Sequence, residues 1–295
     1  MDWQDKLITS YLFICNEYKK HLWAYCERMT NHADMSFTDE EVITIFINGV
    51  IDGRSTLKKI YDDALRHLRQ WFPKLPSYTA FIQRINKIAD VFVPLIEALQ
   101  SYLPKNIYSE AHQIIDSMPI VIAKQGRRFS AKTANEIATS NGYCTTKKMY
   151  YYGVKMHIVG SYKKGSIPVP MYIGLTNAGV GDRKAYEQIL PNLHGNIFAD
   201  KAYQKQNKPI FSDENALLHT PVKKQKGQKI LDSADKLLSS AISSIRQPIE
   251  SLFNWIEEKT KIQMASKVRS YNGLMVHVFG RIAAAFFILM DKFCS

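Results

Sequence analysis

The sequence has few of the features that a secreted, zinc-binding or membrane-spanning chain needs. Its four cysteines, Cys15, Cys26, Cys144 and Cys294, lie far apart and form no CxxC pair, so neither a zinc ribbon nor a disulfide framework is indicated. The first residues lack the basic and apolar regions of a signal peptide, and the most apolar stretch, 282–290, is too short to cross a bilayer. We therefore predict a cytoplasmic protein without a membrane partner, in which 282–290 is a buried helix.

Acidic residues are also scarce relative to basic ones. The chain has 27 Asp and Glu against 39 Lys and Arg, which gives a formal charge of +12. Such a charge attracts polyanions over long distances, and nucleic acid is the first partner to consider. A basic surface that only confers solubility explains the charge equally well.

The first hundred residues are predicted to be helical. Apolar residues recur there at spacings of three and four, and Thr38 with Glu41 forms a capping box before such a run. Ser55 and Ser77 are further predicted N-caps, and the stripe after Ser77 holds one helix face over Phe81–Ile96. With 295 residues and 46% hydrophobic composition, the chain can bury one large core or two modest ones. We predict an all-helical first domain over residues 1–105.

After Pro104 the pattern changes to that of strands alternating with helices. Helices are predicted at 182–193 and in the tail around 249–287, and a turn is predicted at 163–166. Predicted strands are 112–119, 150–160, 169–175, 195–200 and 217–222. This order favours an α/β second domain over residues 106–295, with a mixed sheet covered by helices.

Three acidic residues stand out in the second domain. Asp116 interrupts a strand-like apolar run, Asp200 ends another, and Glu250 follows Pro248 at the start of a helix. Taken one at a time, turns, caps and the helix dipole explain each of them as well. Carboxylates are also the ligands of Mg²⁺, and two such ions can activate an attacking oxygen and stabilise a leaving one in phosphoryl transfer.

The order of five short motifs resembles that of DDE transposases from bacterial insertion sequences of the nine-eight-two type. These motifs are 114–120, 152–157, 175–183, 198–203 and the step Arg246-x-x-x-Glu250. The stretch from Phe37 to Ile85 resembles the helical front end of such enzymes, so the likeness covers nearly the whole chain. The resemblance implies an RNase H-like catalytic domain with a mixed five-stranded sheet, after a helical DNA-binding domain.

The resemblance also implies a function and a site. Asp116 on the first strand bridges two Mg²⁺ or Mn²⁺ ions, while Asp200 after the fourth strand and Glu250 on a helix each bind one. The implied activity is metal-dependent cleavage and strand transfer of DNA at the ends of an insertion sequence. The implied partners are double-stranded DNA, as terminal inverted repeats and as target, and further copies of the chain in a dimer or larger assembly.

Two positions depart from the family pattern. Ser243 and Glu257 stand where many related transposases have a tyrosine and a lysine, and Lys259 or Lys261 are alternative sources of the missing charge. These departures leave room for a catalytically silent DNA-binding regulator. A third hypothesis is an RNase H-like nuclease that cuts DNA without joining strands.

Several basic residues near these motifs are predicted to contact DNA. Arg246 lies four residues before Glu250, and we favour a DNA contact for it over a structural salt bridge. Lys155 and His157 share one face of a predicted strand near the site, although a solvated face explains them nearly as well. Asp182 is predicted to cap the helix that follows it and is not counted as a ligand.

Two further groups of basic residues lie away from the acids. Arg84 and Lys87 belong to the helix after Ser77, which is predicted to enter a major groove; a helical bundle with one wet face is the alternative. Lys223 and Lys224 open an exposed basic loop that either contacts phosphates or is simply solvated.

Overall fold

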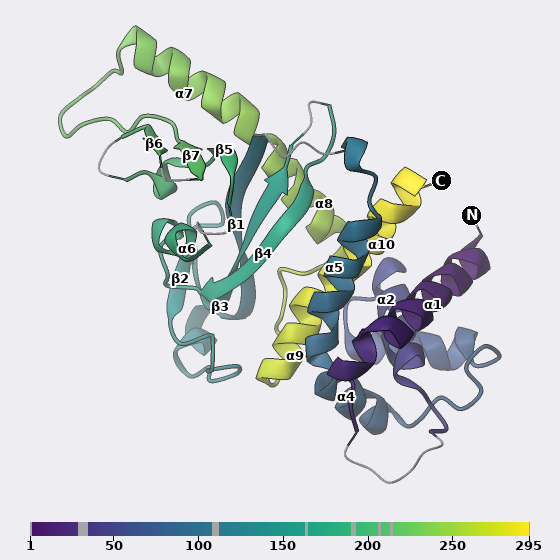
Figure 1. Cartoon of the computed structure of the whole chain (residues 1–295). Coiled ribbons are helices and arrows are strands. Elements are labelled where there is room, and N and C mark those ends of the chain that lie inside the picture. Colours follow the sequence, from purple (N-terminus) through teal and green to yellow (C-terminus); the bar gives the residue numbers. More distant parts are fainter. Residues whose placement is uncertain are drawn as a thin grey trace. The chain divides into compact units, whose positions relative to one another are not determined.

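The chain forms two compact units in the computed structural model, which describes residues 2–28, 35–107, 112–162, 165–189, 193–205, 208–212 and 215–294. The helical unit contains Met1–Pro104 together with Ile256–Ser295, and the sheet unit contains Lys105–Trp255 (Figure 1). The predicted division near residue 105 coincides with the first boundary between the units. The predicted second domain differs from the sheet unit, because residues 256–295 pack with the N-terminal helices instead.

The helical unit consists of short helices around one long C-terminal helix. Its elements before Pro104 are α1 (Trp3–Lys20), η1 (Leu22–Tyr25), α2 (Asp39–Ile51), α3 (Leu57–Asp63), η2 (Ala64–Leu68), α4 (Tyr78–Lys87), η3 (Ala89–Val91) and α5 (Phe92–Tyr102). Its C-terminal elements are α9 (Tyr271–Met275), η8 (Val276–Gly280) and α10 (Arg281–Cys294). Helix α10 packs against α2 and α5, which explains why the tail belongs to this unit.

Most predicted helix starts are confirmed. Thr38 and Glu41 form the capping box of α2, and Ser77 caps α4 by accepting a hydrogen bond from the Ala80 N–H. The Ser55 cap was wrong, because Thr56 caps α3 by accepting from the Lys59 N–H. The Ser55 carbonyl instead accepts a hydrogen bond from Arg281, which ties the tail to this part of the unit.

The C-terminal helix is longer than its apolar stretch indicates. Residues Tyr271–Lys292 form one continuous helical segment with a mean hydropathy of 1.9, which by length and composition suffices to cross a membrane. The prediction considered only residues 282–290, whereas the helical segment begins eleven residues earlier. The most apolar 18-residue window of this segment is 78% buried inside the protein, which confirms the predicted buried helix. The helix belongs to the helical unit, however, and not to the predicted second domain.

The sheet unit is built on a seven-stranded mixed sheet. Its strands are β1 (His112–Lys124), β2 (Asn141–Cys144), β3 (Met149–Ser161), β4 (Val169–Asn177), β5 (Gly195–Phe198), β6 (Ile210–Ser212) and β7 (Ala216–His219). The other elements are η4 (Lys105–Ile107), η5 (Gln125–Phe129), α6 (Asp182–Ile189), η7 (Lys201–Tyr203), α7 (Ser233–Arg246) and α8 (Pro248–Thr260), within which the division between the units falls.

The five predicted strands are all present, but the predicted count was wrong because β2 and β6 were missed. These two have only four and three residues and lie on the margins of the sheet, so they carry too few apolar positions to give a pattern. The five predicted strands run in the order β4-β3-β1-β5-β7. The pairs β4–β3 and β3–β1 are antiparallel, while β1–β5 and β5–β7 are parallel.

Two predicted features were only partly recovered. Helix α6 ends at Ile189 rather than Leu193, and residues 190–192 lie outside the described residues. Lys163 and Lys164 of the predicted turn at 163–166 also lie outside them.

The two faces of the sheet have different neighbours. Ile115 of β1 and Val159 of β3 form a buried cluster with Tyr186 and Ile189 of α6. Side chains of successive strand residues point to opposite faces, so Ser117 shares the α6 face with Ile115, and Asp116 points to the other. Helix α7 contacts β1 and β5 and brings Arg246 to Asp116.

Candidate active site

Strand register brings Asp116 and Asp200 together. The parallel pair β1–β5 is in register only as far as Ile114 opposite Phe198. Asp116 and Asp200 each lie two residues beyond that last pair, where β5 has ended and β1 continues. Ligands bind at the carboxyl ends of parallel strands. Pro119 follows on the edge of β1 that β5 no longer covers, where its missing N–H leaves no partner unsatisfied.

A break between two helices brings Glu250 and Arg246 to the same place. Helix α7 ends at Arg246, and α8 starts at Pro248, which fits the first turn of a helix because it lacks an N–H. Arg246 Nη1 lies 2.7 Å from Asp116 Oδ2, and Arg246 Nη2 lies 2.8 Å from Glu250 Oε1. The guanidinium therefore bridges two of the three predicted acids, so in this structure Arg246 makes the salt bridges that were the alternative to a DNA contact.

Asp116 is an electrostatically strained carboxylate. Its pKa is raised from 3.8 to about 6, mainly by burial and to a smaller extent by the nearby carboxylates of Asp200 and Asp182. The Arg246 charge and the Ser117 N–H, which donates to Asp116 Oδ1 over 2.8 Å, act in the opposite direction but do not outweigh burial. A cation beside Asp116 would relieve this cost.

The donor chemistry at this point fits a hard cation. Asp116 and Asp200 supply carboxylate oxygens, which Mg²⁺ and Mn²⁺ prefer. Among the described residues, however, no three His, Cys, Asp or Glu side chains are close enough to share one ion. Arg246 pairs with Glu250, whose side chain is 58% exposed. The structure thus brings Asp116 next to Asp200 and connects Glu250 to them through a positively charged side chain.

A second polar group lies on the opposite face of β1, behind Asp116. Ser117 donates its hydroxyl hydrogen to Asp182 Oδ1 over 2.9 Å, and Lys155 Nζ contacts the same oxygen at 3.0 Å. Lys155 also donates to the carbonyl of Val180. These two partners hold the ammonium within the protein. In this arrangement Lys155 does not reach out to DNA as predicted.

His157 was also predicted to contact DNA, and this prediction was wrong. The ring is buried, with 2% of the residue exposed, and Nε2 lies 2.8 Å from Thr176 Oγ1 on β4. Burial lowers the pKa of His157 to about 4, so the ring is neutral at physiological pH and carries no charge for a phosphate. Alternation placed it on a strand face, but that face is covered by α6 rather than by solvent.

Asp182 was predicted to cap the following helix and not to be a metal ligand. It opens α6, as a cap does, but its carboxylate binds Ser117 and Lys155 and contributes to the raised pKa of Asp116. Its position within the motif segment 175–183 was the available signal. Ser117 had no comparable signal, because a serine beside a strand aspartate is common.

The basic residues outside this site differ in burial and in their contacts. Arg84 forms a buried ion pair with Asp39, at 2.5 Å, and also donates to the Cys26 carbonyl. Its guanidinium is therefore used within the helical unit, contrary to the prediction that it contacts DNA. Lys87 is exposed on α4, as predicted for a DNA contact. Lys223 and Lys224 are exposed in the loop before α7, and Lys224 donates to the Lys229 carbonyl within that loop.

Comparison with known proteins supports the interpretation of this site. A family model described as a transposase DDE domain matches residues 108–270, more than half of the chain, and this range includes Asp116, Asp200 and Glu250. No curated protein and no solved structure matches the chain. Because this match covers more than half of the chain, which also has a mixed α/β sheet unit, the chain belongs to the transposase DDE domain family.

Proposed function

We propose that this chain cleaves DNA at the ends of a bacterial insertion sequence and transfers the strands to a target, using Asp116, Asp200 and Glu250 to hold divalent metal ions. The observation that carries the proposal is the register of β1 and β5, which sets Asp116 beside Asp200. Structural carboxylates seldom lie side by side without a cation, because two like charges raise each other's pKa. Here burial and Asp200 both act on Asp116 in that way.

Asp116 and Asp200 would hold one Mg²⁺ or Mn²⁺ ion, and Glu250 a second ion together with Asp116. Bound metal supplies an activated oxygen nucleophile and stabilises the leaving 3′ oxygen. In the arrangement described, Arg246 neutralises Asp116 and Glu250. When the guanidinium turns away from them, it carries its charge and its planar donors to a DNA phosphate, a group that arginine binds through two hydrogen bonds.

The sheet itself is consistent with this proposal. Its order β4-β3-β1-β5-β7, with three antiparallel strands followed by two parallel ones, supports an RNase H-like assignment for the sheet unit. We further propose that the helical unit binds the terminal inverted repeats, with Lys87 among its contacts, and that two or more copies act together because two DNA ends must be joined.

The test is a cleavage assay on plasmid DNA that carries the sequences flanking this gene, with Mg²⁺ or Mn²⁺. We expect Asp116→Asn, Asp200→Asn and Glu250→Gln each to abolish nicking and strand transfer while DNA binding is retained. Glu258→Gln is the matched control, because Glu258 lies on the same helix, is 69% exposed and pairs with its neighbour Lys259. Cleavage that survives all three substitutions would refute the site.

A silent regulator is the second function that an observation favours. Glu257, at the position where related transposases have a lysine, accepts a hydrogen bond from the Gln263 N–H over 2.8 Å and so has a structural use of its own. In that case the wild-type chain binds the flanking DNA and yields no metal-dependent product. Cutting without joined products would instead indicate a nuclease.

A further inference from the structure

Three exposed aromatic rings and an arginine form a continuous surface at one end of the sheet unit. Tyr143 on β2 and Tyr150 on β3 are directly paired, with ring centroids 4.7 Å apart. The Arg128 guanidinium lies over the Tyr150 ring at 5.0 Å and over the Phe129 ring at 4.1 Å. We call these four residues the ring platform.

The ring platform is far more exposed than folding requires. Phe129 is 74% exposed, Tyr150 is 54% and Tyr143 is 50%. A cross-strand tyrosine pair stabilises a hairpin, which accounts for part of Tyr143 and Tyr150. It does not account for Phe129, which leaves most of an apolar ring in water at a cost that folding does not recover.

The segment that carries the ring platform is strongly basic. Between Lys124 and Tyr150 the sequence contains six Lys and Arg residues and a single acid, Glu136. Five of these cations are exposed: Lys124, Arg127, Lys132, Lys147 and Lys148. Rings interleaved with cations are the surface that single-stranded nucleic acid requires, because bases stack on the rings and phosphates lie near the charges.

The β2–β3 hairpin that carries the platform packs on buried residues of the sheet unit. On the opposite face of the hairpin, Cys144 and Met149 pack on the buried cluster of Val121, Tyr151 and Ala178. The β2 backbone lies so close to the Ala178 carbonyl that a side chain at Gly142 would approach it to 2.5 Å. Ser140 is also hydrogen-bonded to Asn177, at the end of β4. The rings are therefore presented by an ordered part of the sheet.

We propose that the ring platform binds unpaired DNA bases on a strand that has left the duplex next to the cleavage point. This inference rests on the proposed function for the nature of the substrate. Unpaired bases are favoured over duplex DNA because a duplex hides the faces of its bases, whereas the exposed rings offer flat apolar surfaces to stack on. Stacking needs no particular sequence, so the platform would act on either end of the element.

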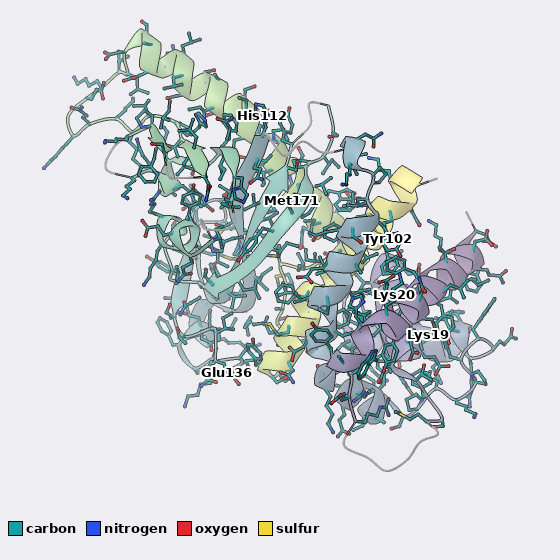
Figure 2. The ribbon with its side chains drawn as sticks, viewed as in Figure 1. Lys19, Lys20, Tyr102, His112, Glu136 and Met171 are labelled. Carbon is teal, nitrogen blue, oxygen red and sulfur yellow. The ribbon has the colours of Figure 1, made fainter. Side chains whose placement is uncertain are left out.

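The platform lies at a suitable distance from the acids. Figure 2 labels His112 at one end of the sheet unit and Glu136, from the loop between Phe129 and β2, at the other. Asp116 and Lys124 are eight residues apart on β1, a path of roughly 26 Å at 3.3 Å per residue. A single strand that leaves the duplex near the acids can cover this path, so the acids and the platform can contact the same strand.

The test measures binding of the full chain, with chelator present, to a blunt duplex and to the same duplex with a single-stranded extension. We expect tighter binding of the extended DNA, and a loss of about 5- to 150-fold for that DNA in Phe129→Ala and Tyr150→Leu, which corresponds to stacking of 1–3 kcal/mol per base. Binding of the blunt duplex should change little. Ile230→Ala is the matched control, because Ile230 is 79% exposed beside a basic loop but has no ring.

Two further readouts separate the alternatives. Fluorescence of 2-aminopurine in the extension should be quenched on binding and restored in Phe129→Ala, because Phe129 ends η5 and belongs to no strand. If ring substitutions leave the preference for extended DNA unchanged, the inference is overturned, and loss of self-association in the same variants would assign the surface to a second copy. Because chelator prevents cleavage, these results stand apart from failure of the cleavage assay itself.

Discussion

Replacing Asp116 with asparagine is expected to stabilise the protein at neutral pH when no metal is bound. The pKa of Asp116 is raised from 3.8 to about 6, first by burial and then by Asp200 and Asp182. A carboxyl whose pKa is higher in the folded than in the unfolded state contributes stability that is complete below about pH 4. That stability is lost as the pH rises through 6, so the ionised side chain is a net cost above pH 7.

The size of the effect follows from the shift. A change of about two pKa units corresponds to about 3 kcal/mol. The Asp116 side chain keeps 21% of its exposure, so solvent screening reduces this figure, and we expect about 1–3 kcal/mol. For a chain of this size that raises the melting temperature by about 3–10 °C. The gain should fall to about half at pH 5 and nearly vanish at pH 4.

The assay is scanning calorimetry of wild type and Asp116→Asn in chelator at pH 8, 5 and 4. Glu258→Gln serves as the control, because a surface substitution of this kind changes stability by less than about 0.5 kcal/mol. Adding Mg²⁺ or Mn²⁺ at pH 8 should raise the melting temperature of the wild type but not of Asp116→Asn. A lower melting temperature for Asp116→Asn at pH 8, or a gain of equal size at pH 4 and pH 8, would contradict the reasoning.

Two further predictions concern basic residues assigned to DNA by their sequence context. Arg84→Met should destabilise the helical unit by about 3–5 kcal/mol in urea unfolding, because it leaves the carboxylate of Asp39, which is 1% exposed, with Arg28 as its remaining cation; unchanged stability would show that the ion pair contributes nothing. The double substitution of Lys223 and Lys224 with glutamine should lower the salt dependence of DNA affinity by about two in log–log slope, since both side chains are exposed in one loop. An unchanged slope would show that the loop is solvated and does not contact DNA phosphates.

Much of the local structure follows from the amino-acid sequence. Thr38 and Ser77 cap their helices because a side-chain oxygen satisfies a free backbone N–H within three residues, an interaction that neighbouring residues decide between themselves. The five predicted strands and the change from helix to sheet near residue 105 likewise follow from apolar periodicity. The acids Asp116 and Asp200 were found because charges that interrupt or end apolar strands are rare.

The contacts between distant residues depended on the tertiary structure. Only strand register could show that Asp116 lies beside Asp200, and only the break at Pro248 could turn Arg246 toward Asp116. Side-chain alternation placed His157 on one face of its strand, but the packing of α6 decided that this face is buried. Charge alone could not separate Arg84, which is used within the core, from Lys87, which faces solvent, because pairing and burial depend on what the rest of the chain brings near each residue.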